Sequence, residues 1–307
     1  MKVAVFGAGG VGGYFGGRMA EAGADVHLIA RGEHLSALRE GGLTVDSVFD
    51  DFAVDLPATD DPADIGPCDF VLFTVKATDT ESAARDLHPL IGDETAVVTL
   101  QNGVRNEALL ADEVGTEHVM GGVAYIFSTI AEPGVIEHTG GPTRFVYGEL
   151  DGRRSARAER LLEFCRDADI DAELSEDIHT DLWTKFLFIC AQSGMTAATR
   201  LPLGAIRETE STWRMYGRIM DEVAAVGRAD GVDIDDETVE KWRDLASGLE
   251  PELTSSLHYD LTHEKPMELE ALHGDVVDRA ETYGVDVPMT EAVYALLKPW
   301  ADRFARE

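Results

Sequence analysis

The start of the chain contains the feature that most restricts its fold. An apolar run at residues 3–6 ends in the sequence Gly7-Ala8-Gly9-Gly10-Val11-Gly12. A helical pattern follows, and a second apolar run at residues 26–30 ends at Arg31. This order of apolar run, glycines, helix and apolar run predicts a βαβ unit at the first strand of an α/β fold.

The glycines within this unit have the spacing GxGxxG, which is typical of dinucleotide-binding turns. Gly7 would permit the tight turn, Gly9 would let a pyrophosphate approach the backbone, and Gly12 would let the helix pack closely on the sheet. The unpaired N–H groups at the helix N-terminus would meet the pyrophosphate charge. The alternative is a glycine-rich turn in an α/β protein that binds no nucleotide, and the flanking strand and helix argue against it. We therefore expect a cofactor to bind along the whole turn, at Gly7, Ala8, Gly9, Gly10, Val11 and Gly12.

The end of the second strand indicates which cofactor would bind. NAD sites usually place Asp or Glu there to bond the ribose 2′-hydroxyl, whereas NADP sites place Arg near the 2′-phosphate. This chain has Ala30-Arg31-Gly32, and the nearest carboxylate, Glu33, is expected to begin the next helix. The sequence therefore predicts NADP(H), held by Arg31. The alternative is that Arg31 is a solvated loop residue.

The charge of the chain restricts its partners. It has 58 Asp and Glu residues against 26 Lys and Arg residues, for a formal net charge of −32. Nucleic acid and acidic membrane surfaces would be repelled, and no apolar run approaches transmembrane length. The acids are dispersed and lysine is scarce, which is typical of salt-accumulating halophiles, where salt screens the self-repulsion. The alternative, an acidic partner-binding surface, would be expected as a block of acids.

The three cysteines, Cys68, Cys165 and Cys190, are far apart and lie in apolar runs. They form no CxxC pair and no disulfide framework, so we expect buried thiols in a reducing compartment and no metal site. The chain enters its first strand without a signal peptide. These observations predict a cytoplasmic protein, for which a homodimer is possible.

Strand and helix patterns alternate through the first half of the chain. The runs at 70–75 and 96–100 are typical of strands buried on both faces of a parallel sheet. Residues 43–56 indicate a hairpin or a sheet edge, 80–87 a helix, 118–124 a strand, 155–168 a helix and 170–174 a last strand. The strand-like runs at 135–138 and 144–147 flank the turn-like sequence Thr139-Gly140-Gly141-Pro142-Thr143, which predicts a hairpin.

Beyond about residue 175 the pattern is helical throughout. Helices are expected at 178–198, 209–230, 235–248, 267–284 and 289–304. We therefore predict an α/β N-terminal Rossmann-type domain with a mostly parallel sheet, residues 1–175, that binds NADP(H). An all-helical (all-α) C-terminal domain, residues 176–307, would carry the substrate and catalytic groups.

Two polar residues directly follow the buried strands of the first half. Lys76 comes after the run at 70–75, and Asn102 comes after the run at 96–100, within Gln101-Asn102-Gly103. Ligands bind at the carboxyl ends of the strands in open α/β sheets, so both residues are predicted to line the cofactor crevice. The alternatives are a solvated turn lysine and an ordinary Asn-Gly turn.

The helix expected at 178–198 holds a lysine among aromatic residues. Lys185 lies close to Trp183 and Phe186 in the sequence. A lysine in such surroundings more often directs its ammonium outward to water. However, three of the four positions that share its helix face are polar, which fits a ligand-lined face better than a core face; they are Ile189, Gln192, Ser193 and Thr196. Further along, Ser256 and Glu268 by themselves indicate only a helix cap and a surface acid.

Together these residues resemble the ketopantoate reductase (2-dehydropantoate 2-reductase) family over essentially the whole chain. The resemblance rests on the glycine motif, Lys76, the Gln-Asn-Gly turn, the Trp-x-Lys helix, and the spacing of Ser256 and Glu268. It implies an NADP domain followed by a helical domain, with the active site in the cleft. It also implies that Lys185 is the general acid and that Asn102 contacts cofactor and substrate. Ser256 would contact the substrate, and Glu268 would lie near the nicotinamide ribose and Lys185.

The chemistry of these residues agrees with the reduction of a ketone. Hydride transfer to a carbonyl develops charge on its oxygen, which a positioned ammonium can stabilise and protonate. Burial beside Trp183 and Phe186 would lower the pKa of Lys185, and Glu268 would raise it. We therefore predict NADPH-dependent reduction of 2-dehydropantoate to pantoate, a step of pantothenate and coenzyme A biosynthesis.

One departure from the family pattern bears on the substrate. The best-known members of the family carry two asparagines on the lysine face that bind pantoate, and Ile189 and Ser193 stand at those positions here. Gln192, on the same face, could substitute for one of them. The alternatives are therefore a reductase of another small branched 2-oxo acid or, from a different class, a non-catalytic protein that senses NADP(H).

Overall fold

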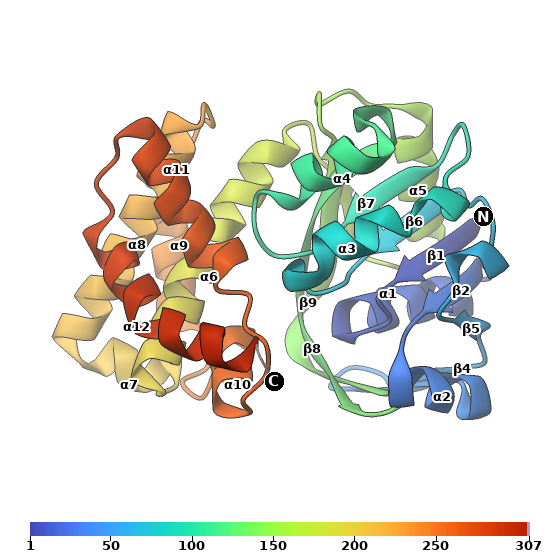
Figure 1. Ribbon diagram of the computed structural model, residues 1–307, viewed down its shortest axis with the longest axis horizontal. Helices are drawn as coiled ribbons and strands as arrows, with labels where there is room; N and C mark the ends of the chain where they lie inside the picture. The colour runs from blue at the N-terminus through green and yellow to red at the C-terminus, as the bar shows by residue number, and fades with distance from the viewer. Residues whose placement is uncertain (306–307) are drawn as a thin grey trace. The chain divides into compact units, whose positions relative to one another are not determined.

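The computed structural model describes residues 1–305, which form two compact units (Figure 1). The first unit comprises Met1–Gln101 and Asn106–Ile178. The second comprises the short loop Asn102–Arg105 and the chain from His179 onward. Each unit is described by itself below.

The first unit is built on one ten-stranded sheet, in the order β4-β3-β9-β8-β7-β6-β1-β2-β5, with β10 paired to β9. The pairs are parallel except for β3–β4 and β8–β9, so the sheet is mostly parallel and the predicted α/β class is confirmed. The strands are β1 (Lys2–Phe6), β2 (Asp25–Ile29), β3 (Leu43–Ser47), β4 (Phe52–Val54), β5 (Ala58–Thr59), β6 (Phe70–Phe73), β7 (Ala96–Thr99), β8 (Val119–Glu132), β9 (Val135–Glu149) and β10 (Ala172–Leu174).

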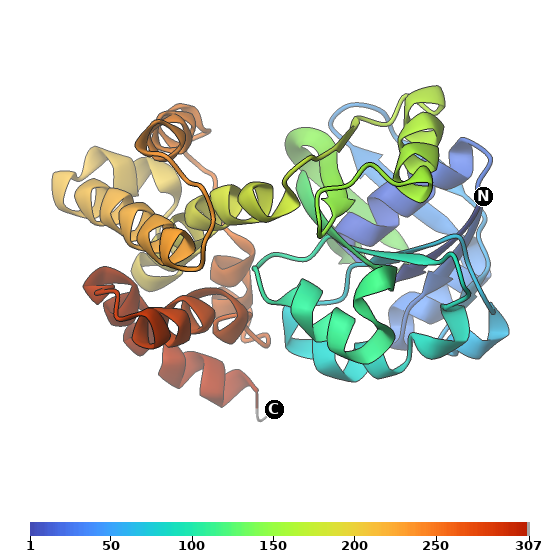
Figure 2. The ribbon, with the colours of Figure 1, turned by 90° about the horizontal axis from the view of Figure 1, so that it is seen from above.

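Helices cover both faces of this sheet (Figure 2). One apolar core joins the sheet to α1 (Gly10–Glu21), α2 (Gly32–Gly41) and α5 (Ala156–Asp167). A second core on the other face includes residues of α3 (Thr80–Arg85) and α4 (Asn106–Val114). The central strands β6 and β7 therefore lie between two cores, which explains why they are buried at every position and apolar except at Thr99.

The predicted hairpin at residues 43–56 is confirmed as β3–β4, with β4 at the edge of the sheet. The hairpin predicted around residues 139–143 is wrong. Residues 135–149 form the single strand β9, which pairs antiparallel with β8 across a turn at Pro133 and Gly134. The positive φ angles of Gly140, Gly141 and Thr143 are absorbed inside the strand, where the register with β8 is irregular. These turn-like residues thus produce bulges in a long strand and do not reverse the chain.

The second unit is helical, and no strand occurs in the part of it that the structure describes. The five predicted helices are present, but the one expected at 267–284 begins only at residue 270, with a π-turn at Glu270–Gly274. Two short helices, α7 and α10, were not predicted. The helices are α6 (Ile178–Thr199), α7 (Leu203–Glu208), α8 (Glu210–Ala229), α9 (Asp236–Gly248), α10 (Ser256–Thr262), α11 (Asp275–Tyr283) and α12 (Pro288–Phe304).

Helix α6 provides much of the core of the second unit. Trp183, Phe186 and Leu187 on α6 are buried together with Tyr216 and Met220 of α8. A helix that packs on several sides needs apolar residues around most of its circumference, and α6 has them. Lys185 is the one lysine of this helix and lies beside these buried aromatic residues.

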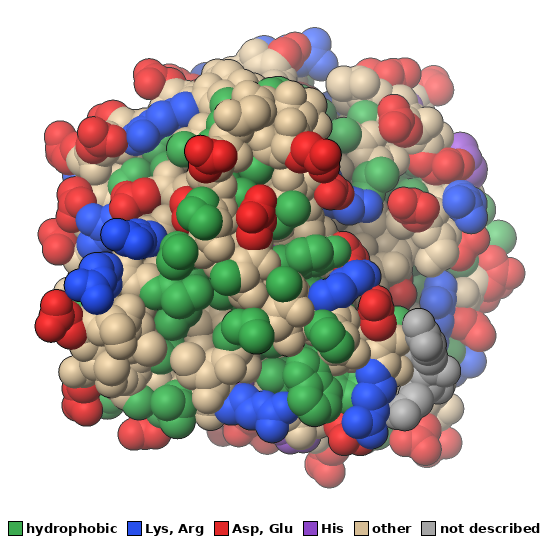
Figure 3. Space-filling model, turned by 60° about the vertical axis from the view of Figure 1, so that its left-hand side comes forward, with side chains coloured by type: hydrophobic (Ala, Val, Ile, Leu, Met, Phe, Trp, Pro, Cys, Tyr) green, Lys and Arg blue, Asp and Glu red, His purple; other side chains and the backbone are tan. Residues whose placement is uncertain are grey.

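The surface agrees with the acidic composition. Acidic side chains are spread over the face shown in Figure 3, and hydrophobic side chains gather toward its centre.

All three cysteines are free and buried. Burial raises the pKa of the Cys68 thiol to about 11 and that of Cys165 to about 12. Within residues 1–305, no helix has both the length and the apolar character needed to span a bilayer.

Candidate functional site

The glycine turn has the geometry that its motif predicts. Gly7 has a φ of +101°, which favours glycine, and a Cβ there would lie 2.8 Å from the backbone nitrogen of Val75. A Cβ on Gly12 would lie 2.5 Å from Gly7 O and 2.8 Å from a methyl of Val5 in β1. By contrast, a Cβ on Gly9 would meet nothing within 4 Å. Gly7 and Gly12 are therefore required by the fold, whereas Gly9 borders open space that a ligand can occupy.

The first three amides of the turn bond within the protein, and the N–H of Gly9 donates to Gly7 O at 2.7 Å. The N–H groups of Gly7 and Ala8 both donate to Ile29 O at 3.1 Å, and Thr74 Oγ1 donates to Gly7 O at 2.7 Å. Helix α1 begins at Gly10, and the N–H groups of a first helical turn have no partner within their helix. Such groups bind a pyrophosphate, so the residues of the turn fit the phosphates of a dinucleotide.

Arg31 and Lys76 lie at the same edge of the sheet as the glycine turn. Arg31 follows β2 and Lys76 follows β6, and both strands pair in parallel with β1, which leads into Gly7. Arg31 is exposed, and its guanidinium lies 3.9 Å from a carboxylate oxygen of Asp86. Glu33 lies in the first turn of α2, as predicted. The first unit thus brings the glycine turn and the side chains of Arg31 and Lys76 to the carboxyl ends of three adjacent strands.

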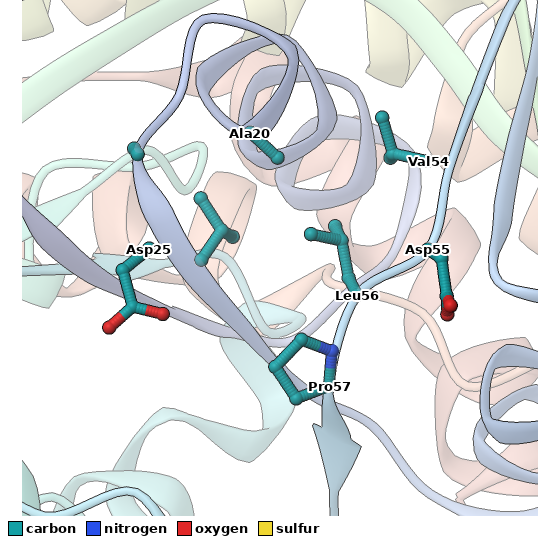
Figure 4. A pocket seen from close by; sticks show the side chains of 8 residues that line it. Ala20, Asp25, Val54, Asp55, Leu56 and Pro57 are labelled. Carbon is teal, nitrogen blue, oxygen red and sulfur yellow. The ribbon is translucent and has the colours of Figure 1, made fainter.

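The first unit also contains a pocket of about 320 Å³ away from this edge (Figure 4). It includes Asp25 and Val26, where β2 begins, and so lies toward the opposite end of that strand from Arg31. None of the residues predicted to bind cofactor or substrate lines it. The lining residues are Ala20, Ala24, Asp25, Val26, Val54, Asp55, Leu56 and Pro57.

In the second unit, the side chains of Lys185 and Asn102 are hydrogen-bonded. The Lys185 ammonium donates to Asn102 Oδ1 at 2.8 Å. Burial lowers the pKa of Lys185 to about 8, while the negative charge of Glu268 acts in the opposite direction. Both directions are those expected from the sequence. Glu268 lies in the segment before the π-turn. An ammonium with this pKa is largely protonated at neutral pH and can still release its proton.

The polar residues on the Lys185 face differ in what they can offer a ligand. Gln192 accepts a hydrogen bond from the hydroxyl of Tyr216 and donates to Thr254 O, both at 3.3 Å. Thr196 bonds to Ser255 Oγ at 2.8 Å. Ser193 Oγ is buried and has no hydrogen-bond partner among the described residues. The Ser193 hydroxyl is thus available to a ligand, whereas Gln192 is already bonded to neighbours in the core.

The alternative role considered for Ser256, that of a helix cap, belongs to the neighbouring Ser255. Ser255, and not Ser256, is the N-cap of α10, because its side chain accepts from the N–H of His258 at 3.0 Å. Ser256 is the first residue of the helix and is exposed. Its hydroxyl is therefore not consumed as the cap.

Two histidines that the sequence analysis did not select have specific roles in the structure. His34 bonds to the glycine turn, with its Nε2 2.7 Å from Ala8 O. His273, in the π-turn, is fully buried against Gly194 of α6, and its Nε2 lies 2.9 Å from Cys190 O. Burial lowers the pKa of His273 to about 4. Neither residue belongs to a motif, so only the three-dimensional contacts reveal them.

Comparison with known proteins decides the family. The model of the family "Ketopantoate reductase PanE/ApbA" matches residues 3–152, and that of its C-terminal domain matches residues 177–301. The chain belongs to the ketopantoate reductase family. The resemblance inferred from the motifs is thus confirmed, and the protein is an oxidoreductase of a nicotinamide-dependent family.

Individual relatives of this ketopantoate reductase family member align along its whole length. The chain is 32% identical to an uncharacterised oxidoreductase, YkpB, of Bacillus subtilis, over 97% of this chain and 98% of the relative. It is also 32% identical to a 2-dehydropantoate 2-reductase of Archaeoglobus fulgidus, over 97% of both. A crystal structure of a family member from Ralstonia eutropha superposes with a TM-score of 0.91 at 33% identity, covering 99% of this chain and 100% of the other.

Proposed function

We propose that the protein reduces a small 2-oxo acid with NADPH, that 2-dehydropantoate is its substrate, and that pantoate is its product. The observation that carries the proposal is the Lys185 ammonium, which is buried enough to have a pKa of about 8 and is oriented by Asn102. A cation in such a position suits a substrate that has a carboxylate beside the ketone.

In this proposal Lys185 is the proton donor. Its ammonium would bond to the ketone oxygen, stabilise the charge that develops there and transfer a proton to it. Asn102 Oδ1 accepts from Lys185, and we propose that Asn102 also contacts cofactor and substrate. Glu268 keeps the ammonium protonated before the reaction. Ser256 and Ser193 would contact the substrate through their hydroxyls, and Gln192 would do so only by giving up its present bonds.

The first unit would hold the cofactor, which supplies the hydride when it is bound. Residues Gly7 to Gly12 would bind the pyrophosphate, and Arg31 the 2′-phosphate. Lys76 of the first unit is proposed to bind the cofactor as well, and cofactor contacts are also proposed for Asn102 and Glu268 of the second unit. The exposed position of Arg31 directly after β2 supports the choice of NADP(H), since β2 ends at Ile29 and is followed by Ala30 and Arg31, and not by the Asp or Glu that is usual in NAD sites.

A second candidate substrate is another branched 2-oxo acid. The half-buried Ile189 lies one helical turn from Lys185 and cannot form a side-chain hydrogen bond. This favours an apolar substituent on the substrate over a hydroxyl group near that position. A non-catalytic NADP(H) sensor is the candidate from a different class, and the paired Lys185 and Asn102 argue against it because phosphate binding needs neither.

The test is an NADPH-oxidation assay with a panel of 2-oxo acids, in molar KCl because the chain is so acidic. Steady oxidation with 2-dehydropantoate preferred supports the proposal. Preference for another 2-oxo acid would favour the second candidate, and NADPH binding without turnover on any acid would favour the sensor. We propose that the protein acts in pantothenate biosynthesis in the cytoplasm of a halophile. The homodimer is a separate expectation, and light scattering of the purified protein tests it.

A further inference from the structure

His34 joins the glycine turn to a distant part of the sheet. It lies near the start of α2, and its ring makes two hydrogen bonds within the first unit. Nε2 lies 2.7 Å from Ala8 O in the turn, and Nδ1 accepts from the N–H of Gly134 at 3.0 Å. Gly134 is the turn residue of the β8–β9 hairpin. One side chain thus bridges the cofactor turn and the end of the longest hairpin.

The bond from Gly134 determines which ring nitrogen of His34 carries the proton. A backbone N–H can only donate, so Nδ1 must present its lone pair. The proton of the ring is therefore on Nε2, from which it is donated to Ala8 O. Any side chain that replaces His34 must supply both an acceptor and a donor to keep both bonds.

The same hairpin contacts the glycine turn at a second point. A Cβ on Gly10 would collide with Ser128 O and would lie 2.9 Å from the nitrogen of Thr129, and both of these residues are in β8. The first residue of α1 is therefore packed directly against the hairpin. A change in the position of the hairpin would displace the backbone that is proposed to meet the pyrophosphate.

The direction of the turn carbonyls also matters for an anion. A carbonyl oxygen that points toward a phosphate repels it, whereas an N–H group attracts it. In this turn Gly7 O is held by Thr74 Oγ1, and Ala8 O is held by His34. Both carbonyls are thereby engaged by protein donors, and the N–H groups of Gly7, Ala8 and Gly9 also bond within the protein. The N–H groups that can meet a ligand are therefore those of the first turn of α1, which begins at Gly10.

We propose that His34 is a positioning residue of the cofactor site, which holds the Ala8 carbonyl and the β8–β9 hairpin in the geometry that a dinucleotide pyrophosphate needs. This rests on the proposed function, because it assumes that a dinucleotide binds at the glycine turn. His34 contacts the turn and not the reacting atoms. Its loss should therefore weaken cofactor binding and leave the chemical step of the saturated enzyme unchanged.

The experiment compares the full-length wild type with His34→Leu, His34→Gln and the control His27→Leu. Leucine removes both bonds, whereas the glutamine amide offers both an N–H donor group and a carbonyl acceptor. His27 lies in β2 of the same unit and bonds to Asp25, so its replacement tests for the general effect of losing a histidine. The Kd of NADPH, the KM of the 2-oxo acid, kcat at saturating NADPH and the free energy of unfolding are measured for each.

The proposal expects the Kd of NADPH to rise about tenfold in His34→Leu, as for the loss of a well-formed hydrogen bond. It expects kcat and the KM of the 2-oxo acid to stay within about twofold, and His34→Gln to recover most of the affinity. A His34→Leu Kd equal to that of the wild type would overturn it. So would a His34→Gln variant that regains stability but not affinity, because His34 would then be structural only. If the wild type itself does not bind NADPH, it is the proposed function that fails.

A measurement on the wild type alone covers the case in which His34→Leu does not fold. NMR of ¹⁵N-labelled histidine distinguishes the two ring tautomers. The proposal expects the His34 proton on Nε2, and a chemical-shift change of this ring when NADPH is added. A proton on Nδ1 is incompatible with the bond from Gly134 and would refute the proposal.

Discussion

The Lys185 ammonium donates a 2.8 Å hydrogen bond to Asn102 Oδ1, although the two residues are 83 positions apart in the chain. The amide oxygen of Asn102 is uncharged, so it orients the Lys185 ammonium without compensating its positive charge. The carboxylate of an aspartate in the same place would orient the ammonium and also neutralise its charge. This difference is what a proton donor to a ketone requires, and it makes Lys185 the first residue to test.

Lys185→Ala should lower kcat by about 100-fold or more, which is the usual scale for the loss of a general acid. The KM of NADPH should change much less, because the phosphate-binding residues are untouched. Lys241→Ala is the matched control, since Lys241 is exposed and paired with Glu237. Steady-state kinetics of both variants decide the matter, and a near-normal kcat for Lys185→Ala would remove its catalytic role.

The rate of ketone reduction should fall as the pH rises through about 8, because the pKa of Lys185 is lowered to that value by burial and only the protonated form donates. Glu268 raises this pKa, so Glu268→Gln should move the alkaline limb of the kcat profile to lower pH. The profile is measured between pH 6 and 10 at saturating substrate (about four units centred on the Lys185 pKa). A limb that stays in place in Glu268→Gln would show that the charge of Glu268 does not act on Lys185.

Gly9→Ala and Gly12→Ala should separate ligand binding from folding. A methyl group on Gly9 meets nothing in the protein, so this variant should keep its stability but lose NADPH affinity at least about tenfold. A methyl group on Gly12 would press on Gly7 O and Val5, so that variant should lose about 1–3 kcal/mol of unfolding free energy. Urea unfolding and NADPH titration measure the two effects. Unchanged NADPH binding by Gly9→Ala would place the pyrophosphate elsewhere.

Arg31→Ala should weaken the binding of NADPH by about 10–100-fold and that of NADH hardly at all. Only NADPH has the 2′-phosphate that the guanidinium would bind. Arg153→Ala, an exposed arginine paired with Asp151, controls for the loss of one positive charge from an acidic protein. Both cofactors are titrated into both variants at the same salt concentration. Equal losses for NADPH and NADH would contradict the assignment of Arg31.

His273 should make the protein less stable in acid. Burial lowers its pKa from 6.5 to about 4, so the unfolded chain takes up this proton at a higher pH than the folded one. The free energy of unfolding should therefore decrease as the pH falls from 6.5 toward 4, by on the order of 3 kcal/mol. In His273→Gln the free energy of unfolding should decrease less over this pH range than in the wild type. His263 is exposed, and His263→Gln serves as the control. Parallel acid dependence in all three proteins would mean that His273 does not contribute.

The sequence predicted the features that depend on local pattern and failed where distant contacts decide. The strands at β6 and β7 and the long helix α6 follow from apolar runs and helical spacing, and they were found where expected. The residues around Gly140 have turn chemistry, but pairing with β8 on both sides of them outweighs it. A prediction from local sequence does not include the backbone hydrogen bonds that a partner strand supplies.

The same limit applies to the candidate site. Lys185 could be selected because a charge within an apolar helix is visible in the sequence. The hydrogen bonds of the Gln192 side chain with Tyr216 and Thr254 could not be predicted, because these partners lie in distant segments of the chain. Ser255 and Ser256 are neighbours of one chemical type, and only the hydrogen bond from the N–H of His258 to Ser255 Oγ shows which of them caps the helix.

The loop Asn102–Arg105 belongs to the helical unit although the chain on both sides of it belongs to the other. The polypeptide consequently passes from one unit to the other three times, after Gln101, Arg105 and Ile178. A fragment cut at Ile178 would contain Lys185 without its Asn102 acceptor and Arg279 without the Val104 carbonyl to which it bonds. Chimeras that join the halves of two relatives at this point would combine a proton donor from one parent with an orienting amide from the other. For recombination, the natural module is the helices together with this four-residue loop.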